Sequence, residues 1–230
     1  MHIHGLQKLS MVDYPGKIAA TVFTGGCNLR CPFCHNALLV TRLTESPRID
    51  TEEVLRFLKS RRGLLDGVVL TGGEPLLQTD AGDFLARVKD MGFAVKLDTN
   101  GCYPDALTQI LEAGSVDYVA MDIKNSREKY AQTVGVPGFD IGPVEESISL
   151  LMSGDTDYEF RTTVVRELHT TEDLEAIGQW IRGAKRYFLQ NFEDSGNLIR
   201  EGFHGFSEEE IRVLSQHAAP YVEYIGVRGY

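Results

Sequence analysis

Cys27-Asn-Leu-Arg-Cys31-Pro-Phe-Cys34 is the segment that decides the fold, and it places three cysteines at the spacing C-x3-C-x2-C. Three thiolates are one short of the four ligands that close a tetrahedral metal site. A four-iron cluster held by three cysteines keeps one iron open to a ligand that is not a protein side chain. The segment therefore predicts a cluster whose last ligand comes from outside the protein.

Two other metal sites fit the same cysteines. Cys31-Pro-Phe-Cys34-His35 matches the C-x-x-C-H motif that attaches haem c, but haem would leave Cys27 without a role. Haem c also requires an oxidising compartment, and residues 1–5 lack the basic and apolar stretches of a secretory signal. Zinc could bind the three cysteines and His35, although zinc ligands usually come as two separated pairs. The residues favour the cluster and leave both alternatives open.

The composition is that of a globular protein. The chain has 230 residues, of which 43% are hydrophobic and 24% charged, and we expect one domain over 1–230. The net charge of −10 argues against nucleic acid and against a basic membrane patch. No apolar run is long enough to cross a bilayer, so we expect a cytoplasmic protein without a membrane partner. We interpret the remaining cysteine, Cys102, as an ordinary small side chain.

Apolar runs that predict strands alternate with amphipathic segments that predict helices. The expected strands are 18–23, 67–70, 93–97, 118–121, 159–165, 187–189 and 222–227. The expected helices are one that begins after Asp50, followed by 80–91, 104–113, 143–152, 171–181 and 207–217. This alternation predicts an α/β fold with parallel strands. Six strand–helix units fit either a partial barrel or an open doubly wound sheet.

Polar or glycine-rich clusters follow the predicted strands. Besides the cysteine segment they are 71–75, 98–101, 122–124, 161–163 and 190–191. Each has a simpler explanation on its own: Gly72-Gly73 as a tight turn, and Asp122 and Lys124 as an ion pair. Function gathers at the carboxyl ends of strands in both architectures. Because the clusters converge there, they predict one site.

The motifs resemble those of a known family. The cysteine spacing followed by Gly72-Gly73-Glu74-Pro75 resembles the radical S-adenosylmethionine (SAM) superfamily over nearly the whole chain. Segments 13–17, 23–28 and 34–36 resemble glycyl-radical-enzyme activating proteins, above all those of anaerobic ribonucleoside-triphosphate reductase. Asp98-Thr99-Asn100-Gly101 and Met121-Asp122-Ile123-Lys124 resemble activase motifs at the same strand ends.

The resemblance implies a partial (β/α)6 barrel with parallel strands and two cofactors. It implies a [4Fe–4S] cluster on Cys27, Cys31 and Cys34, and SAM on the open iron. The methionine amino end would be held by Gly72, Gly73 and Glu74, and further SAM contacts would come from Asn36, Asp98, Asp122, Lys124 and Arg161. A monovalent cation could bind at Asp98, Thr99 and Asp122.

The implied activity is reductive cleavage of SAM and formation of a glycyl radical on a partner enzyme. Many activases carry an eight-cysteine insertion after the cluster motif, whereas no cysteine lies between Cys34 and Gly72 here. We therefore expect an external one-electron donor of the flavodoxin or ferredoxin type. The alternative is a radical SAM enzyme that acts on a small molecule, such as a carboxy-deazaguanine synthase. Cys34-His35-Asn36 and Asp98-Thr99-Asn100-Gly101 favour the activase.

Overall fold

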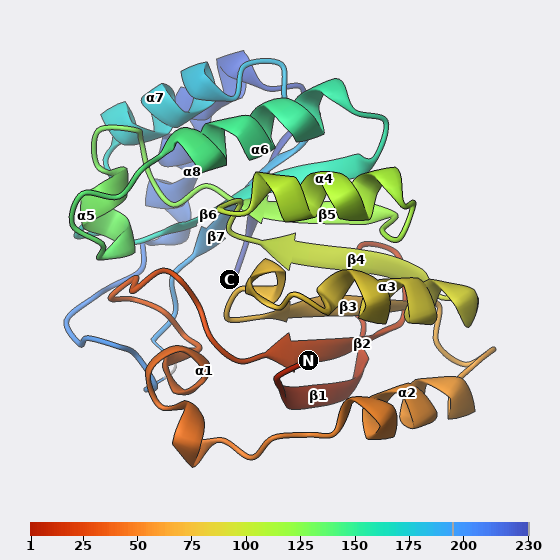
Figure 1. The fold of residues 1–230 in the computed structure, drawn as a ribbon. Coiled ribbons are helices and arrows are strands. Elements are labelled where there is room, and N and C mark those ends of the chain that lie inside the picture. Colours follow the sequence, from red (N-terminus) through yellow and green to blue (C-terminus); the bar gives the residue numbers. More distant parts are fainter. Residues whose placement is uncertain (195, 230) are drawn as a thin grey trace. The chain divides into compact units, whose positions relative to one another are not determined.

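The structure is a computed structural model that describes residues 1–194 and 196–229, and its elements are labelled in Figure 1. The chain divides into two compact units. Unit 1 comprises Met1–Asn28 and Leu38–Ala120, and unit 2 comprises Leu29–Ala37 and Met121–Tyr230. Cys27 consequently belongs to unit 1, while Cys31 and Cys34 belong to unit 2.

Unit 1 is built on strands that pair in chain order. They are β1 (Ile3–Ser10), β2 (Ala19–Thr24), β3 (Gly67–Gly72) and β4 (Ala94–Thr99). The parallel pairing runs in register from Ala19↔Gly67 to Thr24↔Gly72. Four successive residues are buried at the start of both β2 and β3, which is typical of parallel strands covered on both faces. The helices of this unit are α1 (Ala37–Thr41), which begins at its edge, α2 (Thr51–Ser60), α3 (Ala81–Asp90) and α4 (Pro104–Glu112).

Strand β1 differs from the sequence analysis, which placed the first strand at 18–23. It pairs antiparallel with β2, with Ile3 opposite Thr24 and Ser10 opposite Ala19. Only its two end residues, Ile3 and Ser10, are buried, and the residues between them are half-buried or exposed. The sequence therefore lacks both the apolar run and the regular alternation that identify a strand.

Unit 2 contains a second set of parallel strands. They are β6 (Asp157–Val164), β7 (Tyr187–Asn191) and β8 (Ile225–Arg228), paired in that order, and β5 (Tyr118–Asp122) spans the division between the units. The helices are α5 (Tyr130–Val134), α6 (Gly142–Ser153), α7 (Thr171–Trp180) and α8 (Glu208–Ala218). Apart from the short α1 and α5, each helix and its position were predicted from the sequence.

Side-chain caps fix where several helices begin. The Asp50 carboxylate accepts hydrogen bonds from the backbone of Glu52 and Glu53. Ser207 and Glu210 form the predicted capping box at α8. Such caps satisfy backbone N–H groups that have no partner within the helix, and each stabilises the helix by about 1 kcal/mol.

Each unit has its own apolar core. Val68, Leu70 and Leu97 are fully buried in unit 1, as are Phe160, Leu189 and Ile177 in unit 2. In the described part of the chain, no helix has both the length and the apolar character needed to span a membrane.

A buried ion pair links β6 to β8. Glu159 has no solvent exposure, and its two oxygens accept hydrogen bonds of 2.7 and 2.8 Å from the Arg228 guanidinium. The same guanidinium lies 3.5 Å from the ring centroid of Phe188 on the intervening β7. Because Glu159 is out of contact with water, the Arg228 guanidinium stabilises its negative charge.

We predict that Arg228→Ala lowers the free energy of unfolding by about 3 kcal/mol, because it leaves a buried carboxylate without its guanidinium. Arg212→Ala is the control, since Arg212 pairs with Glu208 on the exposed face of α8. This control should cost less than about 0.5 kcal/mol. Urea unfolding measures both, and equal losses would contradict the assignment.

Candidate active site

In unit 1, the loop that carries Cys27 lies against the loop after β3. Backbone hydrogen bonds join them, from Gly73 N–H to the Thr24 carbonyl at 2.9 Å and from Glu74 N–H to the Gly26 carbonyl at 2.8 Å. The position of Cys27 therefore depends on the segment 72–74, which the sequence analysis predicted to lie near it.

The two glycines of this segment are required by that close approach. Gly72 has φ +121°, and a Cβ there would lie 2.3 Å from the Thr24 nitrogen. A Cβ on Gly73 would lie 2.0 Å from the Gly26 carbonyl oxygen. No other residue type fits either position without moving the backbone. The packing of the protein chain is thus enough to explain Gly72-Gly73.

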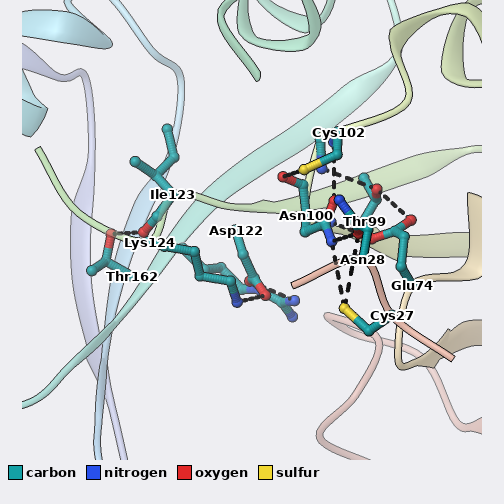
Figure 2. A network of polar contacts seen from close by, with 12 residues as sticks. Cys27, Asn28, Glu74, Thr99, Asn100, Cys102, Asp122, Ile123, Lys124 and Thr162 are labelled. Carbon is teal, nitrogen blue, oxygen red and sulfur yellow. Dashed lines mark hydrogen bonds and ion pairs between the residues drawn. The ribbon is translucent and has the colours of Figure 1, made fainter. Parts of the chain in front are cut away.

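Glu74 is fully buried and fastens two strand ends together. Its Oε1 accepts hydrogen bonds from Leu76 N–H and from the Thr99 hydroxyl, both at 2.9 Å. Its Oε2 accepts from Asn100 N–H at 2.7 Å. The loop after β3 is therefore held to the end of β4 by one side chain, as Figure 2 shows.

Asn100 continues this network toward the cysteine loop. Its side-chain amide donates to Asn28 Oδ1 at 2.8 Å and lies 3.8 Å from Cys27 Sγ, while its Oδ1 accepts from Cys102 N–H at 3.0 Å (Figure 2). Asn100 was predicted only as part of the motif 98–101, and these side-chain contacts were not predicted. The dipeptide Asn100-Gly101 on its own gives no signal for them.

Lys96 is a second residue that the sequence analysis missed. It lies in the middle of β4 and is 2% exposed, and its ammonium pairs with Asp98 two residues along the same face. A lysine within the apolar run 93–97 was the available signal, because lysine is almost never fully buried unless it is paired. Asp98 therefore already has a cationic partner inside the protein.

In unit 2, aromatic packing anchors the half of the loop that carries Cys31 and Cys34. Phe33, between the two cysteines, is 3% exposed and packs edge-on against Phe192 and Phe203, with ring centroids 6.5 and 6.3 Å apart. The four cysteines of the chain carry free thiols rather than disulfides. Among the described residues, no group of three or more His, Cys, Asp or Glu side chains is already arranged to hold a metal ion, so the three thiols stay a predicted ligand set.

The environment of Cys34 includes three of the predicted site residues. Burial raises the pKa of its thiol, while the backbone N–H of Asn36 and the charge of Lys124 lower it and Asp122 raises it. Asn36, Lys124 and Asp122 thus lie near this cysteine in unit 2. A bound metal ion would outweigh burial and deprotonate the thiol outright.

Asp122 lies between two cations at the end of β5. Its Oδ2 accepts from the Lys124 ammonium at 2.8 Å, and its Oδ1 accepts from Arg161 on β6 at 2.9 Å. Burial alone would raise the pKa of Asp122, but Arg161 and Lys124 lower it to about 2. Burial lowers the pKa of Lys124, but Asp122 and Cys31 raise it above its usual range. The three side chains carry one net positive charge while only 12 to 26% exposed, an arrangement that favours an anionic ligand.

Backbone contacts hold the segment 122–124 in place. Thr162 on β6 donates to the Ile123 carbonyl at 2.7 Å, as Figure 2 shows. The buried His169 ring accepts from Val165 N–H through Nδ1, so its Nε2 carries the proton and donates to the Lys124 carbonyl at 2.9 Å. A neutral histidine is therefore part of the support for Lys124.

Comparison with known proteins identifies the family. The model of the radical SAM superfamily matches residues 21–184. The chain belongs to the radical SAM superfamily. It is 34% identical to a "Putative glycyl-radical enzyme activating enzyme" of Methanocaldococcus jannaschii, over 98% of this chain and 95% of the relative. It therefore groups with the glycyl-radical enzyme activating members of the radical SAM superfamily.

This radical SAM protein is also similar to a second activating enzyme in sequence and to a solved structure in fold. Over 60% of both chains it is 33% identical to the pyruvate formate-lyase-activating enzyme of Clostridium pasteurianum. Its fold matches the Streptococcus suis protein SuiB bound to its precursor peptide, with a TM-score of 0.71 and 14% identity over 91% of this chain and 48% of SuiB. The predicted α/β class with parallel strands is confirmed. The family implies an iron–sulfur cluster and SAM, which favours the cluster over haem and zinc.

We predict that His169 makes stability depend on pH. Burial lowers the pKa of His169 below its ordinary value of about 6.5, so the unfolded chain binds a proton at a pH where the folded chain does not. The contribution of the neutral His169 to the free energy of unfolding is therefore fully present above about pH 6.5. It falls as the pH drops toward the folded pKa, by up to about 1.4 kcal/mol per pH unit.

Urea unfolding at several pH values between 5 and 8 measures this slope. His169→Gln, whose side chain can still donate to the Lys124 carbonyl, should remove most of the slope below pH 6.5. His217→Gln, at an exposed position on α8, should keep it. An unchanged slope in His169→Gln would show that other groups cause the pH dependence.

Proposed function

We propose that this protein cleaves SAM reductively and generates a glycyl radical on a partner enzyme, an anaerobic ribonucleoside-triphosphate reductase. The observation that carries the proposal is the C-x3-C-x2-C segment, whose cysteines form no disulfide and whose first cysteine lies beside the Gly72-Gly73-Glu74 segment. The relative from M. jannaschii supports a glycyl radical enzyme as the protein substrate. The resemblance of segments 13–17, 23–28 and 34–36 favours a reductase over the lyase that the C. pasteurianum relative activates.

We assign Cys27, Cys31 and Cys34 as the cluster ligands. The type and number of donors support the assignment, because three cysteines outside disulfides, with no fourth cysteine in the loop, would leave one iron open. A [4Fe–4S] cluster held by these cysteines would supply the one electron needed to cleave the carbon–sulfur bond of SAM, and the hydrogen would be removed from the partner enzyme. The residues of this chain then have to bind, orient and enclose the cofactor.

The residues present fit SAM in two parts. We propose that the backbone of Gly72 and Gly73 holds the methionine amino end, and that Lys124 and Arg161 attract the carboxylate through the positive charge they leave around Asp122. Asn36 joins them near Cys34. The predicted direct contact between Glu74 and SAM stays a prediction. The Glu74 side chain is fully buried, and its oxygens already accept three hydrogen bonds from the protein. We propose that Glu74 acts by shaping the loop.

The proposed monovalent cation fits poorly in unit 1. Asp98 is paired with the Lys96 ammonium, which would repel a second cation. The Thr99 hydroxyl donates to Glu74 and accepts from Gly101 N–H at 3.1 Å. These contacts argue against a cation at Asp98 and Thr99, so the predicted site at Asp98, Thr99 and Asp122 stays a prediction and no step is assigned to it. The external flavodoxin or ferredoxin and the cytoplasmic location also stay predictions.

We predict that Cys27→Ala, Cys31→Ala and Cys34→Ala each abolish the cluster, because two thiolates cannot hold it. Cys102→Ala is the matched control and should bind iron as the unaltered protein does. Iron and sulfide content after reconstitution without oxygen measures the effect, with about four of each per chain expected in the control. Stoichiometric zinc with no iron would contradict the cluster assignment.

The activity itself is tested with candidate partners. The reduced protein, SAM and an anaerobic ribonucleotide reductase should give the doublet of a glycyl radical in electron paramagnetic resonance. Pyruvate formate-lyase is the control partner and should give a weaker signal. A signal only with the lyase would correct the partner. Turnover of a small molecule with no doublet from any partner would support the carboxy-deazaguanine synthase alternative instead.

A further inference from the structure

Asn100 occupies a position that the proposed chemistry leaves unexplained. It follows β4 at 5% exposure, and its backbone N–H is fixed by Glu74 Oε2 at 2.7 Å. A residue that only formed a turn would need no more than that backbone contact and a short side chain. The Asn100 side chain instead reaches the cysteine loop at two atoms, Asn28 Oδ1 and Cys27 Sγ.

Its contacts fix which way the Asn100 amide faces. Cys102 N–H is a donor only, so the atom that it contacts at 3.0 Å must be the amide oxygen. The amide nitrogen is then on the opposite side, where both neighbours can accept a hydrogen bond. Asn28 Oδ1 lies at 2.8 Å and Cys27 Sγ at 3.8 Å, within the longer range of hydrogen bonds to sulfur (Figure 2). The orientation follows from the protein alone.

We propose that Asn100 is a positioning residue that donates a hydrogen bond to the Cys27 sulfur and thereby raises the reduction potential of the cluster. The inference rests on the proposed function, because it needs Cys27 to be a cluster ligand. Hydrogen bonds to cluster sulfurs are among the determinants of the potential. A donor stabilises the reduced cluster more than the oxidised one, since the reduced form carries more negative charge on its sulfurs.

The same contacts hold the Asn100 side chain in a fixed orientation. Glu74 holds the backbone of Asn100, Cys102 N–H holds the amide oxygen, and Asn28 shares the amide nitrogen. The N–H group therefore cannot turn away to water when the charge of the sulfur changes. A hydrogen-bond donor that is already fixed in place stabilises the added negative charge most strongly, because the protein does not have to reorganise.

The test measures the midpoint potential of the reconstituted cluster in Asn100 variants. Asn100→Asp keeps the oxygen that accepts from Cys102 N–H but replaces the donor to sulfur, and Asn100→Leu removes both. At the midpoint potential of the wild type, the ratio of reduced to oxidised cluster should fall at least about threefold in each variant. This ratio corresponds to a decrease of about 28 mV in the midpoint potential for one electron. The shift should be larger for Asn100→Asp, because it adds a negative charge.

Asn28→Leu is the matched control. It removes the competing acceptor and leaves the donor to Cys27, so the potential should stay the same or rise. Four irons with an unchanged potential in both Asn100 variants would overturn the inference. Loss of iron in both would also overturn it, because Asn100 would then only hold the loop. Absence of a cluster from the unaltered protein would instead refute the proposed function.

Discussion

The buried carboxylate of Glu74 is the contact on which the geometry of unit 1 depends. It accepts hydrogen bonds from the loop after β3 and from both Thr99 and Asn100 at the end of β4. The backbone N–H of Glu74 donates to the carbonyl of Gly26, one residue before Cys27. A buried carboxylate is stable only when its oxygens have such donors. The backbone just before Cys27 and the ends of β3 and β4 are therefore joined through Glu74 within unit 1.

In unit 2, a partly buried carboxylate is stabilised by neighbouring positive charges. Arg161 and Lys124 flank Asp122 and lower the pKa of its carboxyl to about 2, against the effect of burial. Thr162 and His169 fix the backbone of Ile123 and Lys124, which limits how far Lys124 can move toward a ligand. The result is a partly buried group with one excess positive charge. Fixed charges of this kind bind an anion with little reorganisation.

The sequence predicted the strands, the longer helices and the polar clusters because each depends on local signals. Periodicity identifies elements such as α3, and glycine pairs such as Gly72-Gly73 mark close backbone approach. Strand β1 was missed because its burial comes from pairing with β2 rather than from its own apolar pattern. Lys96 and the side chain of Asn100 were missed because their partners are known only once the strands are placed.

The central claim is that three thiolates leave one iron open for SAM. Mössbauer spectroscopy of the 57Fe-reconstituted protein, with and without SAM, tests it most directly. We predict that one of the four irons changes its isomer shift when SAM is added, because that iron gains ligands from the methionine end, while the other three keep theirs. Four irons with spectra that SAM does not alter would contradict an open iron that binds SAM.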